Sequence, residues 1–206
     1  MTTEPLPCVE IAGPGDPLLL PWLDLYETAF PPWQRVLVSD LLRALGRRAA
    51  GAPTSLELLA VPDGAGGLDG MACVCFTPSG IAWPWYLAVR SESRGRGLGS
   101  ALYSEVVRRA RGAACPAMVF EVEIPSDMPN GVPRRNAERR IGFYQRLGAQ
   151  LLGGIYYLQE IGRHQPPAPM HVMVHAFEPA DAARAFALAQ SVLGDAIRQV
   201  GALALD

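Results

Sequence analysis

Residues 81–110 of the chain read IAWPWYLAVRSESRGRGLGSALYSEVVRRA, and this stretch decides the fold. Residues 85–90 are apolar and typical of a strand, whereas Leu98, Leu102 and Val106 recur at the spacing of a helix. Three glycines lie at the change of period, so the sequence predicts a strand, a tight loop and a helix. Glycine has no Cβ, so the backbone N–H groups of such a loop can approach a ligand, and the first helical turn adds unpaired N–H donors. The segment is therefore predicted to bind a phosphate group.

Different nucleotide-type ligands require different spacings of the glycines in such a loop, so the spacing distinguishes between them. A P-loop is excluded, because no Gly-Lys-Ser/Thr follows and the chain contains no lysine. A dinucleotide-binding G-x-G-x-x-G pattern needs glycine or alanine where Ser100 stands. A methyltransferase-type G-x-G-x-G pattern does match, with Glu121 at about the place of a ribose-binding acid, but Ser93 stands where that pattern prefers an acid. Use of S-adenosylmethionine therefore stays an alternative.

The pattern Arg94-x-x-Gly97-x-Gly99, after a strand ending Leu-Ala-Val, resembles the acyl-CoA-binding loop of the GNAT superfamily of N-acetyltransferases. The later stretch FYQRLGA at residues 143–149 is similar to that family's tyrosine-bearing helix, which closes with Gly-Ala before the next strand. The resemblance covers residues 7–178. It implies a mixed α/β (α+β) fold of the GNAT acyl-CoA N-acyltransferase type: a twisted, mostly antiparallel sheet of about seven strands with helices on both faces, in a single domain over residues 1–206.

The resemblance also implies an enzyme that moves an acetyl group from acetyl-CoA to a primary amine by direct attack in a ternary complex. The coenzyme pyrophosphate would lie on backbone N–H groups of the loop, and the pantetheine arm along the preceding strand. That strand parts from the next one in this family, and the freed N–H near Val89 polarises the thioester carbonyl. The residues that the resemblance assigns to the coenzyme are Leu87, Val89, Arg94, Gly95, Arg96, Gly97, Leu98, Gly99 and Ser100.

The acceptor amine needs a base, because an alkyl amine has a pKa of about 10.4 and is mostly protonated at neutral pH. Residues 117–124 read as a strand, whose alternation places Glu121 and Glu123 on one face as base candidates. Packing against the arginine-rich helix that follows is their alternative role. Tyr144 matches the family's general acid, which protonates the departing thiolate. The family's Asn-x-x-Ala-x-x-x-Tyr pattern is broken, since Arg140 replaces the alanine and Asn136 is displaced by one residue.

The amino-acid composition indicates what kind of protein this is and which partners it is expected to bind. With 206 residues, 50% hydrophobic and 18% charged, the chain is globular, and its net charge of −2 argues against nucleic acid as a partner. No apolar run is long enough for a membrane span, and the start lacks the features of a signal peptide, which predicts a cytoplasmic protein with four free cysteines. His171, Met173 and His175 share one strand face, but without a third ligand nearby we predict no metal site.

The remaining segments are predicted from periodicity and from turn residues. We expect a short strand at 8–12, helices at 17–30, 33–50 and 134–147, strands at 55–61, 70–77, 151–161 and 170–177, a connection at 162–169 and a final helix at 179–200. By resemblance the first two helices wall the pocket of a small-molecule amine or peptide acceptor. The last helix or the final strands would carry the contact of a homodimer, if one forms. A non-catalytic domain that binds acyl-CoA as a sensor is the alternative outside enzymes.

Overall fold

The computed structural model describes residues 8–49, 55–160 and 166–206. These residues form a mixed α/β structure with five α-helices and an open, mostly antiparallel sheet of eight strands in the order β1-β2-β3-β4-β5-β7-β6-β8. The chain forms two compact units, whose boundaries fall between Pro78 and Ser79, inside strand β4 and inside helix α3. The predicted fold class is thus confirmed, and the sheet has one strand more than expected. That the chain is a single domain stays a prediction.

The first unit comprises the described residues up to Pro78 together with Pro84–Arg109. Its elements are β1 (Val9–Glu10), α1 (Leu19–Ala29), the 3-10 helix η1 (Pro32–Gln34), α2 (Val38–Ala49), β2 (Ser55–Pro62), β3 (Leu68–Phe76), β4 (Ala82–Val89), the 3-10 helix η2 (Ser91–Ser93) and α3 (Leu98–Gly112). The second predicted helix begins later than residue 33, because Pro32–Gln34 form the separate turn η1. The last residue of that predicted helix, position 50, lies outside the described residues.

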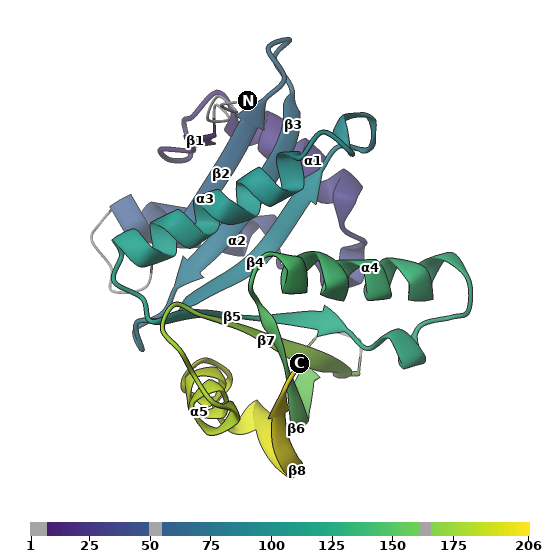
Figure 1. Cartoon of the computed structure of the whole chain (residues 1–206). Helices are drawn as coiled ribbons and strands as arrows, with labels where there is room; N and C mark the ends of the chain where they lie inside the picture. Colours follow the sequence, from purple (N-terminus) through teal and green to yellow (C-terminus); the bar gives the residue numbers. More distant parts are fainter. Residues whose placement is uncertain (1–7, 50–54, 161–165) are drawn as a thin grey trace, which may run out of the picture. The chain divides into compact units, whose positions relative to one another are not determined.

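Strand β3 is covered on both faces, which explains why its sequence LDGMACVCF is almost entirely apolar. Figure 1 shows α3 lying across one face of β2, β3 and β4, with α1 and α2 on the other. Helix α3 comes very close to β3 at Gly70, where a Cβ would lie 2.8 Å from Leu102 Cδ1. On the other face Trp22 of α1 donates from its indole nitrogen to the backbone oxygen of Leu59 at 3.1 Å. The glycine-rich loop therefore leads into a helix that is firmly packed.

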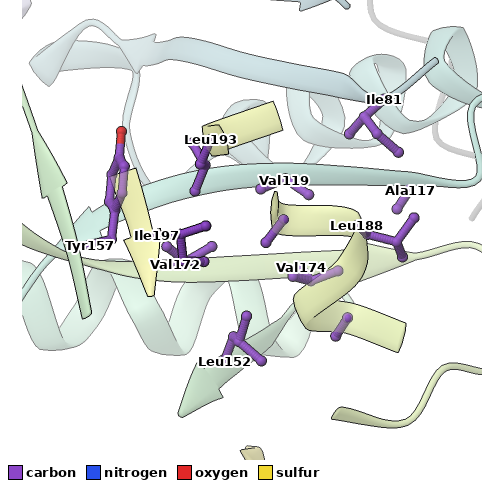
Figure 2. Packing of buried hydrophobic residues seen from close by; sticks show 12 residues of the cluster. Ile81, Ala117, Val119, Leu152, Tyr157, Val172, Val174, Leu188, Leu193 and Ile197 are labelled. Atoms are coloured by element: carbon purple, nitrogen blue, oxygen red, sulfur yellow. The ribbon is translucent and has the colours of Figure 1, made fainter. Parts of the chain in front are cut away.

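The second unit comprises Ser79–Trp83 and the described residues from Ala110 to the end. Its own elements are β5 (Ala117–Glu123), the 3-10 helix η3 (Pro125–Asp127), α4 (Val132–Arg146), β6 (Gln150–Gln159), β7 (Ala168–Ala176), α5 (Ala182–Leu193), the 3-10 helix η4 (Gly194–Ala196) and β8 (Ile197–Leu205). The start of β4 belongs here too and pairs in parallel with β5 at Ala82 and Met118. Figure 2 shows the core of this unit, in which Leu188 and Leu193 pack over Val119, Val172 and Val174.

The prediction of a final helix over residues 179–200 is wrong beyond Leu193. Helix α5 ends there, Gly194 adopts a φ of 56°, and residues from Ile197 onward form β8. Strand β8 pairs antiparallel with β6, and Figure 1 shows it in yellow along that strand. The alanine-rich run of α5 favours a helix by intrinsic propensity, and this preference does not carry into the residues from Ile197 onward, which pair with β6. Of the neighbouring predictions, position 161 and the connection from 162 to 165 lie outside the described residues.

Gly154 lets β8 approach β6 and gives a test of this pairing. Gly154 has a φ of 74°, and a Cβ there would lie 2.0 Å from the backbone oxygen of Ala202. We expect Gly154→Ala to lower the free energy of unfolding by about 2 kcal/mol or more, through strain and backbone displacement. Gly153→Ala is the matched control, because its Cβ would meet Ala204 only at 3.4 Å. Equal urea-unfolding midpoints for the two variants would contradict the β6–β8 pairing.

Candidate active site

The predicted phosphate loop lies in the first unit between β4 and α3. Arg94, Gly95, Arg96 and Gly97 are exposed, and Leu98 is buried at the start of the helix. Gly95 and Gly97 have φ values of 77° and 80°, which side-chain-bearing residues rarely adopt. A Cβ at either glycine would meet no atom within 4 Å, so the space beside the loop is open. The backbone is therefore accessible, as a phosphate-binding loop requires.

The strand before the loop and the helix after it hold the other predicted coenzyme residues. Leu87 and Val89 are partly buried on β4, and Gly99 and Ser100 are partly buried in the first turn of α3. The guanidinium of Arg94 folds back, and its Nε donates to the backbone oxygen of Val89 at 3.2 Å. The first turn of an α-helix leaves backbone N–H groups without intrahelical acceptors, and its dipole favours an anion. All nine predicted coenzyme residues thus belong to one continuous strand, loop and helix start.

Glu121 lies in the second unit on β5, where its carboxylate accepts two hydrogen bonds from uncharged donors. Trp83 Nε1 donates to Oε2 at 2.8 Å, and the Tyr157 hydroxyl donates to Oε1 at 3.0 Å. Burial raises the pKa of this carboxyl, and the two hydrogen bonds oppose the rise only in part. Tyr157 belongs to the apolar cluster of this unit and is labelled at its edge in Figure 2. Glu121 thus has an increased affinity for a proton.

Glu123 is two residues further along β5 and has a different kind of partner. Its Oε2 accepts from Arg140 Nη1 of α4 in an ion pair, and its side chain is only 14% exposed. The structure therefore gives neutral partners to Glu121 and a cationic one to Glu123. Packing against the arginine-rich helix, the alternative role considered for both glutamates, describes the environment of Glu123.

Tyr144 lies on α4, against the opposite face of β5 from Glu121. Its ring packs edge-on against Phe120, with the ring centres 4.7 Å apart. Phe120 and Glu121 are successive strand residues, so their side chains point to opposite faces. Burial raises the pKa of the Tyr144 phenol, which Arg140 lowers and Glu123 raises further. The phenol is therefore protonated at neutral pH.

Helix α4 ends as the sequence predicts. Gly148 follows the helix with a φ of 97°, and the backbone N–H of Ala149 donates to the oxygen of Tyr144 at 3.1 Å. The partners of Glu121, by contrast, were missed. Trp83 falls in the quoted central stretch, but nothing local in the sequence links it to a glutamate on another strand. Tyr157 is further still along the chain.

Neither a metal centre nor a membrane-spanning helix was found in the part of the chain that the structure describes. No three His, Cys, Asp or Glu side chains among those residues are placed to hold a metal ion. His171 and His175 are partly buried, and burial lowers the pKa of both. None of the described helices is long and apolar enough to cross a membrane.

Comparison with known proteins gives the family. A model of the acetyltransferase (GNAT) family matches residues 19–149, which is more than half of the chain and includes the loop, both glutamates and Tyr144. The chain belongs to the GNAT acetyltransferase family. Among curated proteins, no sequence matches it.

Solved structures of GNAT proteins have the same fold. A protein from Bacteroides thetaiotaomicron, described as from the GNAT family, superposes with a TM-score of 0.61 and 22% identity, over 84% of this chain and 90% of that one. One of the GNAT family from Desulfovibrio desulfuricans has a TM-score of 0.52 and 20% identity, over 82% and 97% of the two chains. The protein yncA from Salmonella typhimurium, described with its cofactor acetyl-CoA, has a TM-score of 0.50 and 16% identity, over 71% and 78%.

The environment of Glu121 predicts a pH-dependent stability. Because its folded pKa is raised, the folded state binds more protons than the unfolded chain between the two pKa values, so Glu121 destabilises the fold as pH rises. Glu121→Gln cannot ionise. We therefore expect the stability of the variant, relative to the natural chain, to increase as pH rises from about 4 to about 8.

Urea unfolding at a series of pH values measures this difference. Glu138→Gln removes a charge at an exposed position of α4 and serves as the charge-matched control. A stability difference for Glu121→Gln that follows the control at every pH would contradict the raised pKa.

Proposed function

We propose that this GNAT protein transfers the acetyl group of acetyl-CoA to a primary amine of a small molecule or peptide. The observation that carries the proposal is the exposed loop at residues 94–97, whose two left-handed glycines open the backbone beside the start of α3. The Arg-x-x-Gly-x-Gly pattern of this loop lies within the family match. The acetyl-CoA described with the acetyltransferase structure of yncA supports the choice of donor.

In this proposal the first unit binds the donor. Backbone N–H groups of residues 95–100 bind the pyrophosphate, since that of Arg94 donates to the oxygen of Ser91 at 3.3 Å. The guanidinium groups of Arg94 and Arg96 add charge-assisted contacts. Their exposure in the free protein leaves both side chains able to turn toward a ligand. The pantetheine arm follows residues 87–90, and the N–H near Val89 polarises the thioester carbonyl.

The chemical step is a direct acyl transfer. The neutral amine nitrogen attacks the thioester carbonyl carbon, the C–S bond breaks, and an amide and a coenzyme thiolate form. An ammonium acceptor loses one proton to become the attacking neutral amine, the nitrogen loses a second proton as the amide forms, and one proton goes from an acid to the thiolate. The protein therefore supplies a proton acceptor and a proton donor.

We assign the acceptor role to Glu121 before Glu123. A base works best when its pKa lies near the operating pH, and burial raises that of Glu121 in this direction. Its two partners, Trp83 and Tyr157, are neutral donors that leave it free to take up a proton. The carboxylate of Glu123, by contrast, is engaged in an ion pair with Arg140.

We assign the donor role to Tyr144. A phenol with a raised pKa carries its proton at neutral pH, so Tyr144 holds a proton that it can donate as the coenzyme thiolate leaves. Because Glu121 and Tyr144 face opposite sides of β5, the amine proton reaches Glu121 through a chain of water molecules in this proposal, and Tyr144 protonates the thiolate.

Ligand binding tests the donor. Acetyl-CoA at 100 times its dissociation constant should stabilise the fold by about 2.7 kcal/mol in a thermal unfolding experiment, and S-adenosylmethionine and NADPH should not. Gly97→Ala should weaken this stabilisation, because Gly97 has a φ of 80° in the loop. Gly80→Ala is the matched control, with a φ of 79° and equal open space, but outside the loop.

Each outcome of that experiment has a clear meaning. Stabilisation by S-adenosylmethionine alone would support the methyltransferase alternative and overturn the acetyltransferase proposal. The absence of any shift with acetyl-CoA would do the same for the assigned donor.

Replacing Tyr144 with Phe separates an enzyme from a sensor. We expect kcat to fall by about 100-fold or more, since general acid catalysis contributes roughly that factor, while the dissociation constant of CoA stays unchanged. Tyr156→Phe, at a tyrosine of β6 that is 46% exposed, is the control and should keep full activity. Unchanged turnover in Tyr144→Phe would remove the assigned acid. Acetyl-CoA binding without turnover on any amine would favour the sensor.

A further inference from the structure

A carboxylate on β3 contacts the start of the exposed loop at residues 94–97, which is called the coenzyme loop below. Asp69 is the second residue of that strand, and its Oδ1 accepts a hydrogen bond from the Ser93 hydroxyl. Its other oxygen, Oδ2, lies 3.8 Å from Arg96 Nη1. One side chain that is 20% exposed thus contacts the loop on both sides of Arg94.

The backbone around Ser93 is fixed to the same end of β3. The N–H of Arg90 donates to the oxygen of Asp69 at 2.9 Å, and Arg90 Nε donates to the oxygen of Leu68 at 2.8 Å. The N–H of Ser93 then donates to the oxygen of Arg90 at 3.0 Å. Residues 90–93 are therefore fastened to β3.

Ser93 is the one buried polar or charged side chain among the described residues, with 4% exposure. A buried hydroxyl requires a partner, and a hydrogen bond to an ionised carboxylate is stronger than one to a neutral group. The residues that follow are exposed and include two glycines, which impose little conformational preference of their own. The Ser93–Asp69 bond is thus the last buried contact before the backbone enters the open loop.

We infer that Asp69 and Ser93 position the coenzyme loop, as a latch between β3 and the residues that bind the pyrophosphate. This inference rests on the proposed function. The latch keeps the loop in its binding conformation before the coenzyme arrives. The conformational entropy of the loop is therefore already lost in the free protein, and its loss does not weaken coenzyme binding. Neither residue touches the reacting atoms, so both are positioning residues.

Substitutions that remove the charge of Asp69 distinguish a positioning role of this side chain from a purely electrostatic effect on the ligand. A carboxylate close to the phosphates of a ligand repels them, so a loss of charge alone should favour binding. Asn keeps an oxygen that accepts from Ser93 and removes the charge, whereas Ala removes both. In the latch model Asp69→Ala and Ser93→Ala weaken coenzyme binding, and Asp69→Asn preserves it. The two alanine effects are not additive, because they remove the same hydrogen bond.

Calorimetric titration with CoA tests these expectations, together with steady-state kinetics. The Kd of CoA and the KM of acetyl-CoA should rise about tenfold in Asp69→Ala and in Ser93→Ala, the loss expected for a hydrogen bond to a charged group. The double variant should be no weaker than the weaker-binding single variant. At saturating acetyl-CoA, kcat should stay within about twofold of the natural value, since the latch acts on binding.

Asp63→Ala is the control for a general loss of stability in this region. Asp63 accepts from the N–H groups of Ala65 and Gly67 in the β2–β3 hairpin, so its removal should disturb the hairpin and leave the Kd of CoA unchanged. If Asp69→Ala does not fold, Ser93→Ala carries the test, because it removes only one oxygen atom.

The outcomes separate the inference from the proposed function. Folded alanine variants that bind CoA as tightly as the natural chain would overturn the latch and leave the acetyltransferase proposal intact. A loss of binding in Asp69→Asn equal to that in Asp69→Ala would show a charge effect and would also overturn it. Failure of the natural chain to bind CoA would remove the function on which the latch rests.

Discussion

A loop that offers its backbone N–H groups to a ligand cannot use them to hold itself together, and the first unit is organised around this constraint. Left-handed glycines at positions 95 and 97 open the loop. Its conformation must then come from its two ends. One end is fastened to β3 through Asp69 and Ser93, and the other begins the buried side of α3 at Leu98 and Leu102.

Helix α3 is in turn held to the sheet by a partly buried cation near its other end. Arg109 donates to Glu57 of β2 and to Glu105 of its own helix, at 2.8 Å in each case, and also to Glu10 of β1. Three carboxylates around one guanidinium would repel one another without it, so the arginine is needed at this place. Gly70 allows α3 to lie directly on β3. The helix start to which we assign the phosphate therefore belongs to a firmly packed element.

The sequence predicted those parts of the molecule whose signals are local. The change of period at residues 85–98 predicted β4, the loop and α3, and the glycine after Tyr144 predicted the end of α4. Strand β8 was missed, because the alanine-rich run of α5 leads into it and its pairing depends on Gly154, far back in β6. Trp83 and Tyr157 beside Glu121, and Asp69 beside Ser93, were missed for the same reason. These contacts join residues that are distant in the chain, and periodicity carries no information about them.

The alternation of residues along β5 predicts which face a side chain lies on, but it does not predict the partners of that side chain. It placed Glu121 and Glu123 together on one face, yet Glu121 received two uncharged donors and Glu123 an arginine from α4. Proton affinity depends on those partners, so residues of one type on one face still differ in what they can do.

The surroundings of Ser93 also bear on the competing methyltransferase pattern, which prefers an acid at this position. In the structure its side chain is buried against the carboxylate of Asp69. An acid there would place two carboxylates in contact with little solvent to screen them, and one of the two would have to take up a proton. Asp69 on β3 thus explains why the loop carries a hydroxyl at this point, a residue that donates to a carboxylate without adding a second charge.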